Sequence, residues 1–345
     1  MDKIVTFVIL AYNVEQYLKK CLDSFLCEPV MDRIEVLIID DGSKDTTGQI
    51  AQSYARNYPD TFRVYHKANG GHGSGINAGS AMARGKYFKA IDADDWVITE
   101  KLPAYVEFLE QSSTDVVLTY FHMVDMTTGK KTAKTVAFPA AEALTVRQIM
   151  ENWSDFEPCC VFHGITYRTD FYRRKAHMLP EHVFYEDQEY SAIPFCAAER
   201  VGVLPVFLYQ YLVGNAAQSI SYENQARRIG HLETVLQDLI GYYHARSDAS
   251  QTERDFLCGK IESVSLICFL TAFLYEKDKR RGRTSGDTIN RLLAREVPVI
   301  HGRLQKKYNL FRLMNYLHIS PEMYRKVIES SVYTGLKSKK KYAGQ

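Results

Sequence analysis

The sequence predicts an α/β protein, with a mostly parallel sheet flanked by helices and a helical region after it. The first observation is that apolar runs of strand length alternate with helix-length amphipathic segments over the first 120 residues, a pattern typical of βαβ units. The second is that polar clusters follow three of these runs. The third is that glycines thin out after about residue 222, where apolar residues repeat at helical spacing among Lys and Arg. We therefore expect two domains, residues 1–221 and 222–345.

Five mainly apolar runs in the first domain predict strands. They cover residues 5–10, 34–39, 62–65, 87–91 and 115–120. Because most of these runs are continuous rather than alternating, we expect strands that are buried on both faces. Asn13 is expected to cap the first helix, with Gln16 in capping-box position, and Asp45 to cap the second. A third helix, residues 74–83, consists mainly of small residues.

The C-terminal region predicts further helices. Their apolar positions fall within residues 232–239, 261–272, 310–317 and 323–332. The segment Arg280–Gly286 is rich in Arg and Gly and predicts a mobile connection between helices. The most apolar stretch, Val264–Tyr275, is shorter than the ~20 residues that span a bilayer, so a buried helix is expected there.

Composition and charge limit the partners. A net charge of +2 gives no reason to expect nucleic acid. The basic tail that begins at Lys337 could touch an anionic membrane surface, to which each Lys adds about 1 kcal/mol. The seven cysteines show no Cys-x-x-Cys spacing and follow no signal peptide, which predicts reduced thiols in the cytoplasm, with peripheral contact at the inner membrane face left open. Homo-oligomerisation is left open as well.

Three carboxylates follow the fourth predicted strand, at Asp92, Asp94 and Asp95. So much negative charge at one strand end is costly without a counter-charge. Mn²⁺ or Mg²⁺ bound together with a phosphorylated substrate would supply it, because both ions prefer hard oxygen ligands. A solvated acidic turn is the simpler alternative, since short motifs often arise by chance.

Two more polar clusters, Ala11–Asn13 and Asp40–Asp41, follow the first and second predicted strands. In parallel α/β sheets, ligands bind beyond the carboxyl ends of the strands. The three clusters should therefore converge on one edge of the sheet and form a binding site there.

These three segments, in this order and spacing, resemble the family 2 glycosyltransferases of the GT-A fold. The motifs are Val8–Asn13, Glu35–Thr46 and Gly85–Asp95, and the likeness extends over roughly residues 3–220. The resemblance implies metal-dependent transfer of a sugar from a nucleotide-diphosphate sugar, with inversion at the anomeric carbon, in the synthesis of a bacterial surface polysaccharide. A UDP-sugar is the donor that it favours. A glycan, a lipid-linked sugar or a polymer is the acceptor that it implies.

The resemblance also implies roles for individual residues. Ala11, Tyr12 and Asn13 match the turn that contacts the nucleotide. Asp41 matches the acid that accepts a hydrogen bond from the base, although an acid at this place could also serve only its own turn. Asp94 matches the metal-binding acid of the Asp-x-Asp motif.

The rest of the Asp-x-Asp motif belongs to the same site. Asp92 matches a residue near the ribose or the metal, so that it counts both as a donor contact and as a metal ligand. Ala93 lies between the two acids in the donor site. Asp95 either faces the acceptor or closes the turn, and the sequence favours neither.

The glycine-rich segment Lys67–Asn77 corresponds to a donor-contacting part of the family. Its glycines let backbone approach a ligand, and its helix start offers N–H groups to an anion. Lys67 and Asn77 are assigned to the donor site, Lys67 as a partner for phosphate. The family often has Arg in this segment, where this chain has His72 and Ser74. A flexible connecting loop is the alternative.

Glu186 and Asp187 resemble the family's Glu-Asp pair, in which the second acid is the general base. Asp187 would take the proton of the acceptor hydroxyl as it attacks, and Glu186 would orient or assist it. Leu212 stands where the family often has Arg, so a diphosphate contact common in the family is missing unless His163 or Arg168 replaces it.

Other functions remain as alternatives. A nucleotidyltransferase would show a glycine-rich basic signature after the first strand, and a dinucleotide-binding dehydrogenase would show Gly-x-Gly-x-x-Gly there. This chain has Ala11–Asn13 instead. The alternative from a different class is a non-catalytic relative that binds nucleotide-sugar or glycan. Asp187 distinguishes the two, because replacing the base should abolish transfer only in an enzyme.

Overall fold

The computed structural model describes residues 3–138, 143–214 and 222–329. Side chains of the last helix are described as far as residue 326. The basic tail that begins at Lys337 therefore lies outside the described residues, and so does the end of the helix predicted for residues 323–332.

The chain forms two compact units. The first comprises residues 1–216 and 241–257 and contains the sheet, whereas the second comprises residues 217–240 and 258–345 and is helical where it is described. Because residues 241–257 belong to the first unit, this division is not a single cut, and the predicted boundary after residue 221 stays a prediction.

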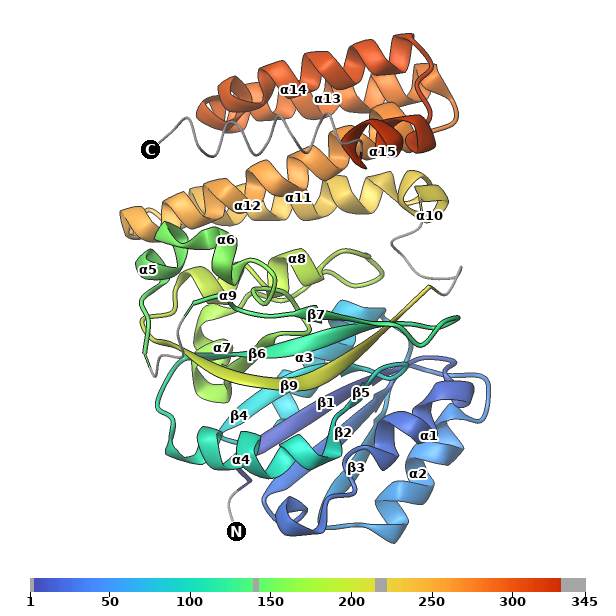
Figure 1. Ribbon diagram of the computed structural model, residues 1–345, viewed down its shortest axis with the longest axis vertical. Helices are drawn as coiled ribbons and strands as arrows, with labels where there is room; N and C mark the ends of the chain where they lie inside the picture. Colours follow the sequence, from blue (N-terminus) through green and yellow to red (C-terminus); the bar gives the residue numbers. More distant parts are fainter. Residues whose placement is uncertain (1–2, 139–142, 215–221, 330–345) are drawn as a thin grey trace. The chain divides into compact units, whose positions relative to one another are not determined.

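The sheet unit has nine strands in the order β3-β2-β1-β4-β8-β6-β9-β5, with β7 paired to β6. The strands are β1 (Val5–Ala11), β2 (Ile34–Asp40), β3 (Phe62–His66), β4 (Tyr87–Asp92), β5 (Trp96–Val97), β6 (Val116–Asp125), β7 (Lys131–Lys134), β8 (Ile165–Arg168) and β9 (Val201–Val213). The five predicted strands are all present, and the predicted α/β class is confirmed (Figure 1).

Strand direction is where the sheet departs from the prediction. β3, β2, β1 and β4 are parallel neighbours, as expected. Beyond β4 the sheet is mixed, because β8 runs antiparallel to both β4 and β6, and β5 and β7 are antiparallel to their partners. The pattern of apolar residues reports burial and not direction, so the sequence alone could not separate these two halves.

Short helices accompany the sheet. They are α1 (Glu15–Asp23), α2 (Thr47–Asn57), α3 (His72–Met82), α4 (Leu102–Gln111), α5 (Val146–Glu151), α6 (Trp153–Phe156), α7 (Thr169–Lys175), α8 (Asp187–Tyr190) and α9 (Ile193–Cys196), together with the 3₁₀ turns Glu28–Val30 and Thr99–Lys101. The predicted helix of small residues begins two residues earlier than expected, at His72, and this places His72 at the helix start.

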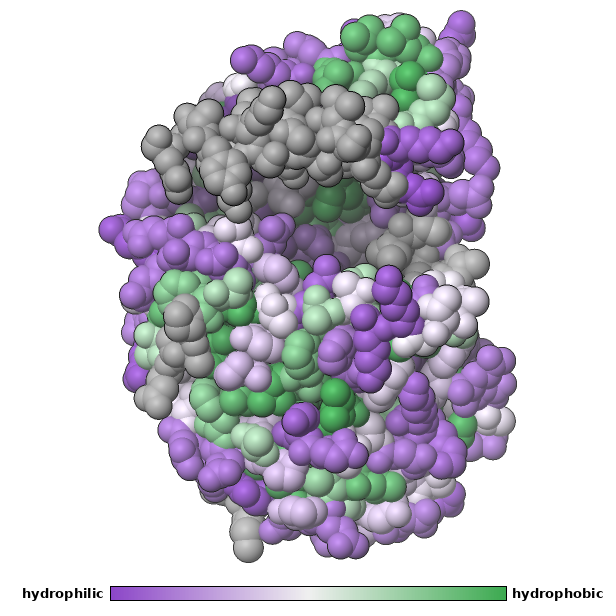
Figure 2. All heavy atoms as spheres, viewed as in Figure 1, coloured by the Kyte–Doolittle hydropathy of each residue, from purple (hydrophilic) through white to green (hydrophobic). Residues whose placement is uncertain are grey.

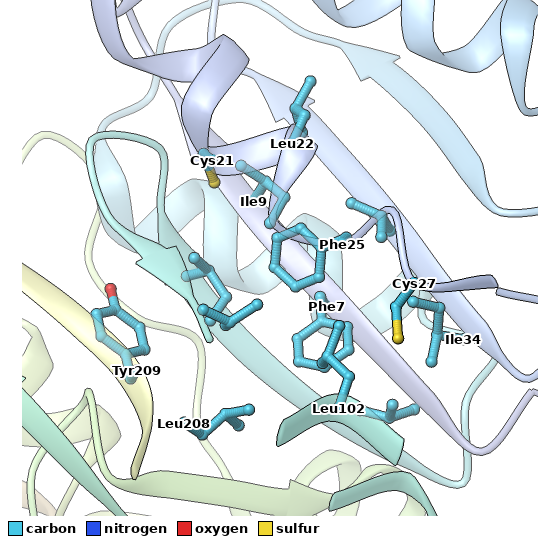
Figure 3. Close-up of a cluster of buried hydrophobic side chains, with 14 of the residues drawn as sticks. Phe7, Ile9, Cys21, Leu22, Phe25, Cys27, Ile34, Leu102, Leu208 and Tyr209 are labelled. Atoms are coloured by element: carbon cyan, nitrogen blue, oxygen red, sulfur yellow. The ribbon is translucent and has the colours of Figure 1, made fainter. Parts of the chain in front are cut away.

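Both faces of β1 are covered, which explains its continuous apolar run. Phe7 and Ile9 pack with side chains of α1, such as Leu22, and the Phe7 ring lies 4.7 Å from that of Phe25 (Figure 3). Val8 faces α3 instead, where a Cβ on Gly79 would lie only 2.1 Å from it. The small residues of α3 therefore let that helix approach the sheet closely.

The predicted cap at Asn13 is wrong. The helix α1 begins at Glu15 without a side-chain cap, and Asn13 has a left-handed backbone with φ of 51°. Its side-chain oxygen instead accepts a hydrogen bond of 2.7 Å from the backbone N–H of Lys44. Asn tolerates this conformation better than most residues, and here it joins the turn after β1 to the turn after β2. Asp45 does bond to the first residue of α2, with Thr47 N–H donating at 3.0 Å.

The remaining helices form the second unit, apart from the parts of α11 and α12 that belong to the first. They are α10 (Tyr222–Arg227), α11 (Ile229–Ala245), α12 (Gln251–Leu270) with a π-helical continuation (Thr271–Tyr275), α13 (Lys279–Glu296), α14 (Pro298–Tyr316) and α15 (Pro321–Glu329). Leu232, Val235, Leu236 and Leu239, which the sequence places on one helical face, are all buried. The predicted helical C-terminal region is confirmed.

The predicted mobile connection Arg280–Gly286 is wrong, because it lies within α13. Asp278 caps this helix by accepting hydrogen bonds from the backbone N–H groups of Arg280 and Arg281. A Cβ on Gly282 would lie 2.1 Å from the carbonyl oxygen of Ala272, and one on Gly286 would lie 2.2 Å from the Phe273 ring. The glycines therefore serve close packing of α13 against the π-helical turn, not flexibility.

One helix, Gln251–Tyr275, has the length and composition to cross a membrane, since it is 25 residues long. The helix is therefore longer than its most apolar stretch, Val264–Tyr275. However, 56% of the most apolar window is buried inside the protein, and Val264, Cys268 and Phe273 are fully buried. A helix with this burial is also what the core of a protein without membrane spans contains, so the expected buried helix is confirmed.

Candidate functional site

The three polar clusters converge at one edge of the sheet, as predicted. In the pairing of β1 with β2, Ala11 lies opposite Asp40, and in the pairing of β1 with β4, Leu10 lies opposite Asp92. The carboxyl ends of these three strands are therefore neighbours. Asn13, Asp41 and Asp94, which follow them, come to the same edge.

Asp41 is buried, and its carboxylate is surrounded by donors from the glycine-rich segment. One oxygen accepts from Lys67 Nζ at 2.7 Å and Gly70 N–H at 2.9 Å. The other accepts from Asn69 Nδ2 at 2.9 Å and Gly71 N–H at 2.8 Å. These four bonds hold the glycine-rich segment against the turn after β2. A base N–H would thus have to share an oxygen that already has two donors.

Lys67 has three partners in this arrangement, one of which is the carbonyl oxygen of Ala68 at 2.7 Å. Besides Asp41, its ammonium donates to the Ser74 hydroxyl at 2.8 Å. Ser74 lies in the first turn of α3, so Lys67 connects the turn after β2 to the start of that helix. The predicted contact with phosphate stays a prediction, and it would have to compete with these bonds.

A cavity of about 270 Å³ lies beside Asp41. Its lining is Leu10, Ala11, Tyr12, Ile39, Asp41, Asn69, Gly71, His72, Gly75, His182, Val183 and Phe184. The predicted residues Ala11, Tyr12 and Asp41 are among them. Tyr12 and Phe184 are both half-exposed aromatic residues, of the kind that can stack on a flat ring. Val183 and Phe184 were missed, because nothing local links this segment to residues near position 12.

Asn77 does not line this cavity. Its amide nitrogen donates to the carbonyl of Leu179 at 2.9 Å, and its amide oxygen accepts from the N–H of Leu179 at 3.0 Å. Both polar groups of the side chain thus hold the segment that precedes Glu186. The structure gives Asn77 a positioning contact, and its predicted contact with the donor stays a prediction.

His72 connects the acidic turn to the predicted base segment. Its Nε2 lies 2.7 Å from a carboxylate oxygen of Asp92, and its Nδ1 contacts the carboxylate of Glu186. Burial alone would lower the pKa of His72, but the two carboxylates raise it well above its ordinary value. The imidazolium therefore neutralises part of the site's negative charge. The sequence showed only that a His stands where an Arg is frequent.

Asp94 and Asp95 keep much of their charge uncompensated. Burial, and then the neighbouring charge of Asp92, raise the pKa of Asp94 to about 6 and that of Asp95 well above its ordinary value. Asp95 accepts hydrogen bonds from the Tyr209 hydroxyl at 2.6 Å and from Leu212 N–H at 2.7 Å. These bonds fix Asp95 in the turn. A cation near these carboxylates would relieve the repulsion between them.

A possible set of metal ligands lies here, and it only partly matches the prediction. Ligand atoms of Asp92, Asp95 and His163 all lie within 4.8 Å of one another. Burial lowers the pKa of His163 to about 4, so its imidazole is neutral and can offer a lone pair. Carboxylate oxygens and an imidazole nitrogen suit Mn²⁺, and the oxygens suit Mg²⁺. Asp94 is adjacent to this set but is not part of it.

Ala93 and Asn13 contribute through their backbones. The N–H of Ala93 donates to the carbonyl of Leu10 at 3.2 Å, and this bond continues the pairing of β1 with β4. The N–H of Asn13 donates to the Ser43 hydroxyl at 3.0 Å. Both residues shape the edge on which the cavity lies, and their predicted contacts with a donor stay predictions.

Glu186 and Asp187 differ in environment. Glu186 is buried and paired with His72, whereas Asp187 is only partly buried and begins α8. The Asp187 carboxylate accepts a bond of 3.1 Å from the Gln188 side chain. The segment before them docks on the glycine-rich segment, where His182 N–H donates to the Gly70 carbonyl at 2.7 Å. Of the two acids, Asp187 is the more accessible.

Leu212 and its two suggested replacements lie in different places. The side chain of Arg168 pairs with Asp115 at 3.0 Å and Asp170 at 2.7 Å, so it is engaged elsewhere. His163 is stacked on Tyr211 with the ring centroids 4.0 Å apart, next to the acidic turn. Only His163 is therefore placed where it could act in the site.

Comparison with known proteins agrees with this geometry. The family described as glycosyl transferase family 2 matches residues 6–189. The uncharacterized glycosyltransferase EpsJ of Bacillus subtilis is 29% identical over 260 residues, which cover 74% of each chain. The structure of S. aureus TarS 1-349 in complex with UDP-GlcNAc has a TM-score of 0.64 at 18% identity, covering 94% of this chain and 92% of that one.

A second solved structure shares the fold more distantly. It is the mannosyltransferase PcManGT from Pyrobaculum calidifontis in complex with GDP-Man and Mn²⁺, with a TM-score of 0.53, 16% identity and coverage of 96% of this chain and 88% of that one. At these identities the two solved structures show the fold alone. The family assignment rests on the match over residues 6–189.

Proposed function

The chain belongs to the family 2 glycosyl transferases, whose match covers more than half of it. We propose that it transfers a sugar from a nucleotide-diphosphate sugar to a hydroxyl group with inversion. The observation that carries this proposal is the His72 bridge between Asp92 and Glu186. It joins the acidic turn, the cavity and the segment of the proposed base into one site.

The cavity beside Asp41 is the proposed place for the nucleoside of the donor. Its volume, about 270 Å³, suits a ring system rather than a whole nucleotide-sugar, and Tyr12 and Phe184 offer aromatic faces to it. We propose a UDP-sugar as the donor. Support comes from TarS, which shares the fold and whose structure contains UDP-GlcNAc.

Asp187 is the proposed general base. It would accept the proton of the acceptor hydroxyl while that oxygen attacks the anomeric carbon from the side opposite the diphosphate, so that one displacement inverts the configuration. Glu186 would not take the proton itself, because His72 already pairs with it. Because Asp187 is the next residue in the chain, a fixed Glu186 would also help to fix the backbone position of Asp187.

The acidic turn is the proposed place for a divalent cation, Mn²⁺ or Mg²⁺. The residues that would hold it are Asp92 with Asp94, as the sequence predicts, or Asp92 with Asp95 and His163, which the structure brings together. When bound, such an ion supplies positive charge to the diphosphate leaving group. His72 would keep Asp92 oriented towards it.

The acceptor and the location are inferred from the family. We propose a glycan, a lipid-linked sugar or a polymer of the bacterial cell surface as the acceptor, and the cytoplasmic side of the membrane as the place of reaction. The alternative is a relative that binds nucleotide-sugar without catalysis. A partly exposed Asp187 beside an intact acidic turn supports the enzyme.

Two measurements test the proposal. Thermal stabilisation by UDP, GDP, CDP and dTDP, each with and without Mn²⁺, should single out UDP and require the metal. In a donor-hydrolysis assay, Asp187→Asn should lower the rate about 10²- to 10⁴-fold and leave the UDP affinity unchanged. Glu181→Gln is the matched control, because Glu181 is an exposed acid of the same segment. Equal measurable rates for Asp187→Asn and the unmodified protein would exclude Asp187 as the base, and no hydrolysis by either protein would favour the non-catalytic relative.

A further inference from the structure

A stripe of exposed side chains runs along α14. Its residues Arg303, Lys306, Leu310 and Leu313 are three or four positions apart, the spacing of one helical face, and Leu317 continues it just past the helix end. All five are exposed. The part nearer the end of the helix is apolar, with Leu310, Leu313 and Leu317 between 49% and 63% exposed.

Two more large apolar residues are exposed in this part of the chain. Tyr316, at the end of α14, and Met323, on α15, are also large and exposed. Figure 2 shows hydrophobic surface over the part of α14 that adjoins α15. Single apolar residues on a surface are ordinary, but a group of them marks an interaction site.

The surroundings of this apolar group are strongly basic. The 19 residues of α14 include four Lys or Arg and no Asp or Glu. Over residues 279–329 there are twelve Lys and Arg against four Asp and Glu, a net charge of +8, whereas the whole chain has +2. Arg303 and Arg312 form ion pairs with Glu262 and Asp287. Lys306 and Lys307 are exposed on the helix surface.

This combination favours one kind of partner. A second copy of the chain would bring a surface of the same charge, and like charges repel. A nucleic-acid backbone would use the positive charges but would leave the leucines facing water. An anionic lipid bilayer uses both, because its headgroups attract Lys and Arg while its interface accepts the apolar side chains of an amphipathic helix.

We propose that α14, with the start of α15, is a docking surface for an anionic membrane. The lysines lie against lipid phosphates, and Leu310, Leu313 and Leu317 enter the interface beneath the headgroups. None of its residues belongs to the basic tail that begins at Lys337, and the proposal does not depend on the proposed transfer reaction.

Vesicle flotation of the full chain tests the proposal without donor or acceptor. Vesicles of phosphatidylcholine containing phosphatidylglycerol should bind the protein, and vesicles of phosphatidylcholine alone should bind it much less. Raising the salt concentration should weaken binding because it screens the charges. Since no sugar is present, failure here leaves the transfer proposal intact, and failure of transfer leaves this one intact.

Two variants separate the contributions of charge and apolar contact. Lys306→Gln/Lys307→Gln should lower the partition coefficient on anionic vesicles about fivefold for each charge removed. Leu310→Ser/Leu313→Ser keeps the charge and should also reduce binding, because the apolar contact is lost. The matched control is Met126→Ser, an exposed apolar residue of the sheet unit that is 45% exposed. Since all these side chains are exposed, the variants should fold, and circular dichroism checks this.

Several outcomes would overturn the proposal. Equal binding to neutral and anionic vesicles would do so, and so would an equal loss in Met126→Ser. A chain that ends at Glu329 should still bind, and complete loss of its binding would assign the contact to the tail. If Leu310→Ser/Leu313→Ser dissociated an oligomer in sedimentation velocity but bound vesicles normally, the stripe would be an interface between copies. Duplex DNA that displaced the protein from vesicles, with unchanged affinity in the leucine variant, would assign the surface to nucleic acid.

Discussion

The turns after β2 and β4 both present acids at the same edge of the sheet. Only in the turn after β2 do hydrogen-bond donors and a positive charge compensate the carboxylate. Asp41, after β2, accepts four hydrogen bonds from Lys67, Asn69 and the backbone of Gly70 and Gly71. After β4, burial and mutual repulsion raise the pKa of Asp94 to about 6 and that of Asp95 well above its ordinary value.

An acidic motif at a strand end therefore does not by itself mark a metal site. Whether an acid is available to a metal ion depends on the hydrogen-bond donors and positive charges that surround its carboxylate. Lys67 and two backbone N–H groups satisfy Asp41, so the carboxylate acts as a structural centre for the glycine-rich segment. His72 compensates Asp92 only, and the acids after it lack a positive partner of this kind among the described residues. The second turn is therefore the one where a cation would gain most.

The largest expected effect concerns metal affinity. Asp92→Asn should weaken Mn²⁺ binding by about 100-fold or more, because a shared ligand is lost, while Asp41→Asn should leave it within about threefold. Isothermal titration with Mn²⁺ measures both. Comparable losses in the two variants would contradict the contrast between the turns. His163→Ala and Asp94→Asn, measured in the same way, then tell which set of ligands is used.

The next largest effect concerns the stability of the protein. Here the substitution of Asp41 should matter more than that of Asp94. Asp41→Asn should lower the free energy of unfolding by about 2 kcal/mol, because Lys67 and several backbone donors lose a charged acceptor. Asp94→Asn should leave the metal-free protein unchanged or slightly more stable, because it removes repulsion. Thermal melts in chelator compare the two variants directly. A larger loss in Asp94→Asn than in Asp41→Asn would reverse the assignment.

The acidic turn should also make metal binding depend on pH. Asp94 binds a proton below a pKa of about 6, and a proton there competes with a cation. The affinity for Mn²⁺ should therefore fall by about fivefold between pH 6 and pH 5, because the ionised fraction of Asp94 falls from about one half to about one tenth. His163, with a pKa of about 4, stays neutral over that range. In Asp94→Asn the decline should flatten, and an unchanged slope in titrations of this variant would rule out Asp94 as its source.

The smallest expected effect concerns the turn that joins the strand ends. Asn13→Ala should destabilise the protein by about 1 kcal/mol, because Ala fits the left-handed backbone less well and loses the bond to Lys44. Asn13→Gly should cost less, since Gly tolerates that backbone. Chemical denaturation of the two variants measures the difference. Equal losses would mean that the hydrogen bond, and not the backbone conformation, carries the effect.

Local patterns were sufficient for the elements and for part of the site. The apolar runs located β1, β2 and β4 because a strand buried on both faces needs apolar residues at nearly every position. β3 was located as well, although its last two residues are exposed. The helical repeat located α11 through Leu232, Val235, Leu236 and Leu239, which are buried together. The acids after the strands were identified in the same way, since strand ends of a parallel sheet meet at one edge.

Local patterns failed where a residue's role depends on a distant partner. Arg280–Gly286 has the composition of a flexible segment, yet Gly282 and Gly286 are small because Ala272 and Phe273 lie against them. The strands β8 and β9 were not predicted. β8 is only four residues long, and Gly202, Pro205 and Gln210 interrupt the apolar residues of the 13-residue β9, so neither shows a long continuous apolar run.

The periodicity of burial along the chain was enough to predict the strands β1 to β4, the helical C-terminal region and the acids that follow the strands. Only the tertiary structure decided what each acid does. The partners of Asp41 are 26 to 30 residues away, and His72 meets Glu186 across 114 residues. Hydrogen bonds and charge interactions act between residues that are distant in the sequence. The turns after β2 and β4 therefore differ in charge compensation only once the chain is folded.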